Sequence, residues 1–123
     1  MPHALIVDDE ADVVDVVRTT LQDEGYRVIV ASNGAEGLER LGNAKPDLLI
    51  CDVMMPFMDG TAMCRQVRDD PAYRHLPIIL ASVMDEAAIN AKFSDYNGFL
   101  RKPFRLADLV DRVATLLKPT GSH

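Results

Sequence analysis

Cysteine and histidine are scarce in this sequence. Two cysteines, Cys51 and Cys64, and three scattered histidines occur among 123 residues, and their spacing matches no metal site. Cys51 lies inside an apolar run, and its side chain is expected on the opposite face of a strand from that of Asp52. This placement predicts a buried, inert thiol. Any chemistry is therefore expected from carboxylates.

Long apolar runs and basic clusters are also missing. No stretch approaches the length of a membrane span, and the start, Met1-Pro2-His3, is not that of a signal peptide. The net charge is −6 and no run of Lys or Arg forms a basic stripe, so neither nucleic acid nor an anionic membrane is expected as a direct partner. These absences predict a cytoplasmic protein.

The sequence does contain an alternation of apolar strands and amphipathic helices. Hydrophobic residues make up 48% of the chain, which is enough for the core of one domain. Short apolar runs predict strands, and apolar residues at three- and four-residue spacing predict helices. The strands are expected at about residues 4–7, 28–31, 48–52, 77–81 and 98–100, and the helices at 13–21, 35–41, 59–68, 86–93 and 106–117, the fourth being weak.

This alternation predicts an α/β fold with a doubly wound, five-stranded parallel sheet and five helices on its two faces. Right-handed crossovers favour the flavodoxin-like strand order 2-1-3-4-5, in which the first and third strands are neighbours at the switch point. In such a sheet, ligands bind at the carboxyl ends of the strands.

Polar residues stand at four of those five strand ends. Crowded carboxylates repel one another, and Mg²⁺ would relieve that repulsion because it prefers hard oxygen ligands and often binds carboxylates together with a phosphate. A lysine and a hydroxyl opposite could hold the oxygens of a phosphoryl group on Asp52. The pattern predicts phosphoryl transfer to a carboxylate nucleophile. The residues are Asp8 and Asp9 after the first strand, Asp52 ending the third, Ser82 ending the fourth and Lys102 after the fifth.

These motifs resemble the signature of response-regulator receiver domains. The similarity runs from about residue 4 to residue 117 and keeps the order of the expected elements. It implies a phosphorylation-activated switch rather than an enzyme acting on a separate substrate, with the phosphoryl group supplied by a histidine kinase or a phosphotransfer protein. It rests on Asp8-Asp9, Asp52 within Asp-Val-Met-Met-Pro-Phe-Met-Asp-Gly, Ser82, and Lys102-Pro103-Phe104.

The resemblance also implies a ligand set for Mg²⁺. Asp52 is the phosphoacceptor, and Asp9 and Asp52 ligate the ion directly. The backbone carbonyl of Met54 is the third protein ligand, and Asp8 acts mainly through a bound water.

Three further roles are implied by the resemblance. Ser82 and Lys102 bind phosphoryl oxygens, and Ser82 and Phe99 change position on activation. These motions alter the surface around the fourth helix and the fifth strand. The partner that reads this surface is an output protein or a fused output domain.

The sequence departs from the family pattern at residues flanking the site. Val83 follows Ser82, where the family usually has a smaller residue, and could narrow access to Asp52. Met54 and Met84 are apolar at two positions where polar residues often orient the attacking water. We therefore predict slow self-dephosphorylation.

A second departure lies between Ser82 and Lys102, where the segment is shorter than is common in the family. The residues 95–97, Asp-Tyr-Asn, replace the usual Gly-Ala. This predicts a short or irregular fourth helix. It also weakens the case for a dimer built on the fourth helix, the fifth strand and the last helix.

Simpler interpretations stay open for individual residues. One of Asp8 and Asp9 would suffice as the N-cap of the first helix, since aspartate is a favoured cap. In these interpretations Ser82 is an ordinary loop hydroxyl, Phe99 a packing residue and Lys102 a surface residue; Glu10 is expected on the solvated first turn and Asp59 as a plain helix cap.

Two other functions compete with the switch. A phosphorylation-independent adaptor would use only the surface of the fold, but it has no physical need for like charges in one cleft. A Mg²⁺-dependent phosphatase of the haloacid-dehalogenase type needs an acid two residues after the nucleophile, and Met54 occupies that position. Residues 1–118 form the expected receiver domain, either a stand-alone regulator or one cut from a longer protein. Residues 119–123 are expected to be a disordered tail or a remnant of expression.

Overall fold

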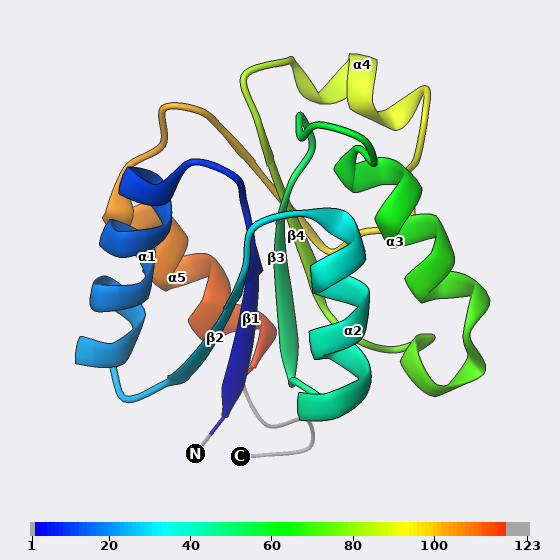
Figure 1. The fold of residues 1–123 in the computed structure, drawn as a ribbon. Helices are drawn as coiled ribbons and strands as arrows, with labels where there is room; N and C mark the ends of the chain where they lie inside the picture. The colour runs from blue at the N-terminus through cyan, green and yellow to red at the C-terminus, as the bar shows by residue number, and fades with distance from the viewer. Residues whose placement is uncertain (1, 118–123) are drawn as a thin grey trace.

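The molecule is built around a central sheet with helices on both of its faces (Figure 1). The structure, a computed structural model, describes residues 2–117. Strands and helices alternate along that part of the chain. The strands are β1 (His3–Val7), β2 (Arg27–Ala31), β3 (Leu48–Asp52), β4 (Ile78–Ser82) and β5 (Gly98–Arg101); the helices are α1 (Ala11–Asp23), α2 (Gly34–Ala44), α3 (Gly60–Asp69), α4 (Glu86–Asn90) and α5 (Leu106–Leu116), with a 3-10 turn, η1, at Pro71–Tyr73.

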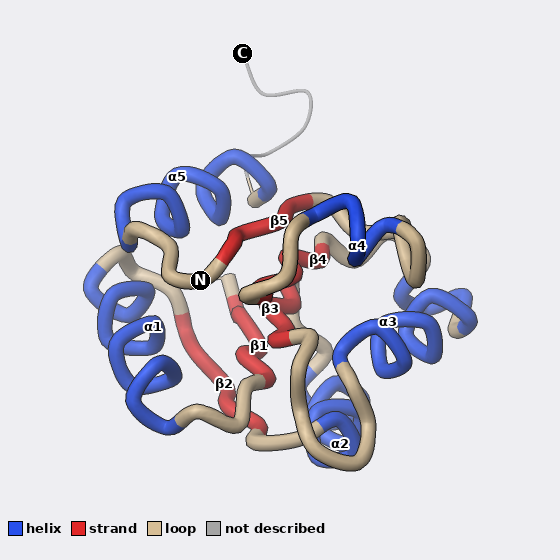
Figure 2. Tube along the Cα trace, turned by 90° about the horizontal axis from the view of Figure 1, so that it is seen from above, coloured by secondary structure: helices blue, strands red, loops and turns tan. Residues whose placement is uncertain are grey.

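The sheet has the predicted topology. All four strand pairs are parallel, and the order is β2-β1-β3-β4-β5. Figure 2, which looks down on the sheet from above, shows the strands side by side in this order. Every residue of β3 and β4 is buried, because helices cover both faces of the sheet at its centre. The prediction of a flavodoxin-like, doubly wound α/β fold is confirmed.

Two apolar cores lie on the opposite faces of the sheet. On one face, α1 and α5 pack through residues spaced three or four apart, such as Val14, Val17 and Leu21 of α1. On the other face, α2 and α3 pack through residues such as Leu41 and Met63. Figures 1 and 2 show the two helix pairs on either side of the sheet. The loops at the carboxyl ends of the strands are therefore held by two separately packed layers.

Side-chain caps fix where three of the helices begin. Asn33 accepts a hydrogen bond from Glu36 N, and Asp59 accepts one from Ala62 N at 2.9 Å. Asp85 caps α4 in the same way. The prediction that Asp59 is a helix cap is confirmed.

The fourth helix is short, as predicted, but it ends at Asn90 rather than at about Phe93. Helical bonds continue past this end, from Ala91 N to the Ala87 carbonyl and from Phe93 N to the Ile89 carbonyl, and two arginines of α3 then hold the segment that follows. Arg65 donates to the Lys92 carbonyl, and Arg68 donates to the Asp95 carbonyl at 2.9 Å. Both carbonyl groups thus accept hydrogen bonds from side chains of α3.

Arg68 holds the segment between α4 and β5, residues 91–97, and is called the Arg68 anchor below. Its side chain is only 8% exposed, and it also donates to the Tyr73 carbonyl at 2.9 Å and to Asn97 Oδ1 at 3.0 Å. Asn97 Oδ1 in turn accepts from Ile78 N at the start of β4. The short segment before β5 is thereby tied to α3 and to β4. The predicted tail, residues 119–123, lies outside the described residues.

Candidate functional site

The register of the sheet brings the predicted strand ends to one level. Val7 pairs with Cys51, so the next residues, Asp8 and Asp52, end neighbouring strands side by side. Asp52 pairs with Ala81 on its other side, next to Ser82. Ser82 pairs with Arg101, which precedes Lys102. Parallel pairing therefore gathers the residues at the carboxyl edge, where ligands bind in such sheets.

Lys102 lies at the centre of this cluster of side chains. Its ammonium nitrogen lies 3.0 Å from Asp8 Oδ2, 3.1 Å from Glu10 Oε1 and 3.3 Å from Asp52 Oδ1. The lysine side chain is 10% exposed, and those of Asp8 and Asp52 are 7% and 4% exposed. The ammonium donates hydrogen bonds to Asp8 and Glu10, and Asp52 is its third ion-pair partner. The peptide bond between Lys102 and Pro103 is cis.

The surroundings make Asp52 a difficult residue to ionise. Burial, followed by the negative charge of Asp8, raises the pKa of Asp52 from 3.8 to about 6, although Lys102 acts in the opposite direction. Burial alone would lower the pKa of Lys102, but its hydrogen bond to Asp8 and the charge of Asp52 raise that pKa instead. The site thus holds the protonated amine of Lys102 next to the carboxyl group of Asp52, whose ionisation is disfavoured.

Three carboxylates face the single ammonium of Lys102, and this excess of negative charge favours binding of a cation. Oxygen atoms of Asp8, Glu10 and Asp52 all lie within 4.8 Å of one another. Asp9, which was predicted as a direct ligand, is exposed and lies outside this group of three, although its charge contributes to the raised pKa of Asp52. A set of hard oxygen donors with one shared ammonium fits a divalent ion such as Mg²⁺.

The cap interpretation of Asp8 and Asp9 is wrong. The N-cap of α1 is Glu10, and Asp8 instead accepts a hydrogen bond from Glu10 N at 2.9 Å. The expectation that Glu10 lies on the solvated first turn is also wrong in part: the side chain is exposed, but it is bonded to Lys102. The only hint in the sequence was a long acidic side chain where a short capping residue is usual.

Ser82 and Phe99 lie near the site on β4 and β5. Ser82 is 1% exposed, and its Oγ accepts a hydrogen bond from Met84 N at 3.1 Å. Phe99 is half-buried, and the centre of its ring lies 6.4 Å from that of Tyr96. Tyr96 donates from its hydroxyl to Glu86 at the start of α4. Both predicted switch residues therefore adjoin the segment that contains α4.

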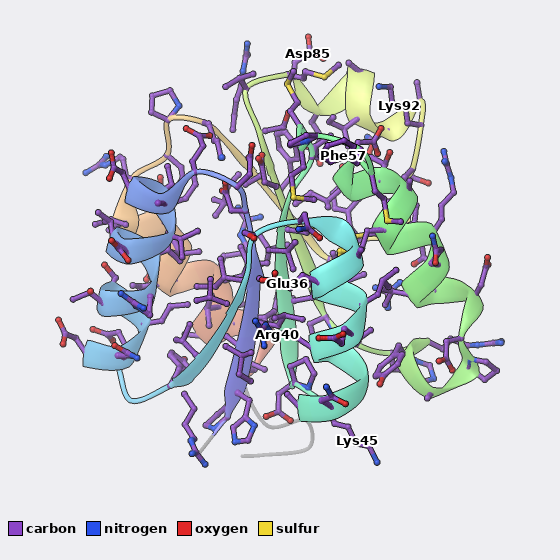
Figure 3. The ribbon with its side chains drawn as sticks, viewed as in Figure 1. Glu36, Arg40, Lys45, Phe57, Asp85 and Lys92 are labelled. Carbon is purple, nitrogen blue, oxygen red and sulfur yellow. The ribbon has the colours of Figure 1, made fainter. Side chains whose placement is uncertain are left out.

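The rim of the site is largely apolar. Met54 and Val83 are 55% and 56% exposed, and Met84 is half-buried. A surface cavity of about 420 Å³ opens beside the end of β3. In Figure 3, Phe57, Asp85 and Lys92 are labelled at this end of the molecule, in and beside the loops that follow β3 and β4. The cavity is lined by Val53, Met54, Met55, Asp59, Met84 and Lys92.

The neighbouring cysteine takes no part in this chemistry. Cys51 is fully buried, and the neighbouring Cys64 thiol, followed by burial, raises the pKa of its thiol well above the ordinary value. A thiol with a raised pKa forms little thiolate, so it is a poor nucleophile. The prediction of a buried, inert Cys51 agrees with this environment.

Comparison with known proteins identifies the family of this chain. The family model for the response regulator receiver domain matches residues 4–114. The response regulator MprA of Mycobacterium ulcerans (strain Agy99) is 40% identical over 124 residues, which cover 94% of this chain and 50% of MprA. The chain belongs to the response-regulator receiver family.

Solved structures agree with this assignment. The crystal structure of a putative response regulator from Chloroflexus aurantiacus has a TM-score of 0.88 and 38% identity, covering 96% of this chain and 98% of that one. The response regulator TrrA from Thermotoga maritima, solved in complex with Mg²⁺ and BeF, has a TM-score of 0.87 and 28% identity, covering 95% of this chain and 100% of that one.

The family defines the general function of this receiver domain. It is a signalling module of two-component response regulators and a phosphorylation-activated switch, not an enzyme of the ordinary kind. The chain spans about half the length of the curated relatives it matches. Within residues 2–117, none of the helices is both long and apolar enough to cross a bilayer.

Proposed function

We propose that Asp52 accepts a phosphoryl group from a phosphohistidine and so switches this receiver domain between two states. A carboxylate oxygen of Asp52 attacks phosphorus, the bond from phosphorus to the imidazole nitrogen breaks, and the histidine retains the electron pair of that bond and takes up a proton. The product is an acyl phosphate on Asp52. The observation that carries the proposal is the position of Asp52 at the carboxyl edge, within 3.3 Å of the Lys102 ammonium.

Lys102 supports this role by its charge. A phosphoryl group on Asp52 brings additional negative oxygens next to an ammonium that is already held by Asp8. Charge-assisted hydrogen bonds from an ammonium to such oxygens are among the strongest available in a protein. Lys102 therefore stabilises the group as it arrives, and Ser82 supplies a hydroxyl once its bond to Met84 N is released.

Mg²⁺ is the cofactor that the donor set fits. In this proposal Asp52 and Asp9, which is exposed and lies outside the group of Asp8, Glu10 and Asp52, would hold the ion together with the backbone carbonyl of Met54, and Asp8 would act through a bound water. When bound, the ion supplies positive charge that offsets the charge of the phosphoryl oxygens. Asp8 and Lys102 meanwhile fix the orientation of the Asp52 carboxylate.

The response of the switch is assigned to α4 and β5. Ser82 moves toward the phosphoryl group and Phe99 changes rotamer, which alters the surface carried by the short α4. The contact of Phe99 with Tyr96, and of Tyr96 with Glu86, supports this route because it links β5 to α4. The partner that reads this surface is an output protein or an output domain in the same chain.

The remaining elements of the proposal follow from this reaction. A histidine kinase or phosphotransfer protein supplies the phosphoryl group, residues 1–118 form the receiver unit, and the location is the cytoplasm. The apolar rim formed by Met54 and Met84 leaves few polar groups to orient an attacking water. The phosphoryl group is therefore lost slowly by self-dephosphorylation.

The experiment is a titration with beryllofluoride, a mimic of the phosphoryl group, in the presence of Mg²⁺. We expect saturable changes in the amide chemical shifts of Ser82, Phe99 and α4 in the wild type, and none in Asp52→Asn. Asp23→Asn, which changes an exposed acid far along α1, is the matched control and should respond as the wild type does. Binding of Mg²⁺ without any response to beryllofluoride would favour an adaptor that acts without phosphorylation.

A further inference from the structure

Glu10 occupies a position in which its side chain does nothing for its own helix. It is the N-cap residue of α1, yet it makes no side-chain capping hydrogen bond. Short polar residues are favoured at this position because their oxygen bonds to the first free amides of the helix. The carboxylate of Glu10 instead reaches across to Lys102 Nζ at 3.1 Å. Its position is thus explained by the site and not by the helix.

The three carboxylates that share Lys102 differ greatly in burial. The side chains of Asp8 and Asp52 are 7% and 4% exposed, whereas that of Glu10 is 59% exposed. A buried carboxylate that loses its counterion remains in a poorly solvated environment, which is costly. An exposed carboxylate is simply hydrated by water, so the bond to Glu10 is the least costly of the three to break.

A phosphoryl group on Asp52 would need one of the three Lys102 donors. Two of them are donated to Asp8 and Glu10, and the third faces Asp52 in an ion pair. We infer that Glu10 is a positioning residue, which holds the Lys102 ammonium in the unphosphorylated receiver domain and gives it up when the phosphoryl group arrives. This inference rests on the proposed function of Asp52.

The consequence is a competition between Glu10 and the phosphoryl group for one ammonium. Breaking the Glu10 contact costs free energy each time the site is loaded, and that cost weakens binding of the phosphoryl group or its mimic. Removing the contact in advance therefore strengthens binding. The carboxylate charge of Glu10 also repels the incoming oxygens, so the test must separate the contact from the charge.

Two variants make this separation. Glu10→Gln keeps the length of the side chain and removes the charge. Glu10→Asp keeps the charge, but its shorter side chain does not reach Lys102 and is suited to cap α1 instead. Asp12→Asn is the matched control, because Asp12 is an exposed acid in the first turn of the same helix.

The measurement is the affinity of the full chain for beryllofluoride at fixed Mg²⁺, together with the nitrogen NMR signal of the Lys102 ammonium before any ligand is added. Because exposed ion pairs contribute little, we expect both Glu10 variants to bind about two- to fivefold more tightly than the wild type. Hydrogen exchange of the Lys102 ammonium should be faster in both, most of all in Glu10→Asp. Asp12→Asn should match the wild type in both measurements.

Other outcomes overturn the inference in identifiable ways. If only Glu10→Gln binds more tightly, then charge alone matters and Glu10 does not position Lys102. If both variants bind as the wild type does, the contact has no role in loading the site. If the wild type itself fails to bind beryllofluoride, the proposed phosphorylation of Asp52 fails first and the inference fails with it.

Discussion

Gly60 lies directly against the backbone of Asp52. A β-carbon at position 60 would collide with the Asp52 carbonyl oxygen and would come within 2.9 Å of Val53 Cα. Gly60 N also donates to the Val53 carbonyl at 2.8 Å. Since α3 begins at this glycine, the start of the helix and the end of β3 are in backbone contact. The position of Asp52 therefore depends on a residue without a side chain.

Replacing this glycine is expected to disturb both stability and the site. In Gly60→Ala the backbone of β3 or of α3 must shift, because no flexible side chain can move aside. Such overpacking should lower the free energy of unfolding by about 1–3 kcal/mol. Urea denaturation measures the loss, and chemical shifts of Asp52 and Val53 report the displacement.

Gly42→Ala is the control for that substitution. Gly42 lies within α2, and a β-carbon there would meet nothing within 4 Å. Alanine in a helix interior is expected to raise stability by about 0.5–1 kcal/mol. An equal effect of the two substitutions, in either direction, would contradict the argument from contact.

The raised pKa of Asp52 predicts a particular dependence of stability on pH. Its pKa is about 6 in the folded chain and 3.8 in the reference state. Below 3.8 both states hold the proton and no penalty exists. Between 3.8 and about 6 the unfolded chain ionises first, so stability falls as pH rises, and the penalty stays constant above about 6.

Asp52→Asn removes this penalty. Without Mg²⁺ the variant should match the wild type near the unfolded pKa and become more stable as pH rises, by up to about 2–3 kcal/mol above the folded pKa. Thermal or urea unfolding of both proteins across this range measures the difference. A difference that is already constant at acid pH would mean that the pKa of Asp52 is not raised.

Lys102 and Asp52 are expected to be energetically coupled. Lys102→Met leaves the buried Asp8 and Asp52 without their shared ammonium and should lower stability by about 2–4 kcal/mol at neutral pH. Adding Asp52→Asn removes one of the two stranded charges, so the double variant should recover part of the loss. A double-mutant cycle in urea measures the coupling, and strictly additive effects would argue against a functional contact.

The Arg68 anchor should be more important for stability than an ordinary surface arginine. Arg68→Met removes the donor that the Tyr73 carbonyl, the Asp95 carbonyl and Asn97 Oδ1 share, and should cost about 2–4 kcal/mol. Ile78 N donates to the same Asn97 Oδ1 as Arg68 does, so its hydrogen exchange should become faster in the variant.

Arg40→Met is the comparison for the anchor. Arg40 and Glu36 lie one helical turn apart on α2 (Figure 3), and they form an ion pair at 3.5 Å with side chains 44% and 34% exposed. Such a pair should contribute less than about 0.5 kcal/mol. If Arg40→Met were as harmful as Arg68→Met, burial of the anchor would not explain its contribution.

The lifetime of the phosphoryl group is the fifth prediction, and it rests on the proposed function. Met84→Glu introduces an oxygen that can orient water beside Asp52, so loss of the phosphoryl group should become faster by about tenfold. Loss of label from the phosphorylated protein measures the rate. Thr19→Glu, which adds the same charge on an exposed part of α1, should leave the rate unchanged. A wild type that loses the group as fast as Met84→Glu does would refute slow self-dephosphorylation.

The position of the strand ends could be predicted because the relevant signal is local. Apolar runs such as residues 48–51 are buried on both faces and end on a polar residue, so periodicity alone reveals where each strand stops. Parallel pairing and right-handed crossovers leave few strand orders, and the favoured order brings Asp8, Asp52 and Lys102 together.

Other features depend on contacts between residues far apart in the chain. Glu10 looked like a solvated helix residue, because its bond to Lys102 spans 92 positions. The segment between α4 and β5 is held by Arg65 and Arg68 of α3, whose hydrogen bonds reach carbonyl groups 27 positions away. No pattern within a helix or strand contains such information.

The sequence by itself determined the fold and the residues that end the neighbouring strands, since these follow from hydrophobic periodicity, and the chemistry of those carboxylates and amines led to the proposal that Asp52 is the phosphoacceptor. Only the tertiary structure decided which carboxylates share the Lys102 ammonium, because that depends on side-chain reach and burial. The sharing leaves Asp9 exposed and draws Glu10 into the site.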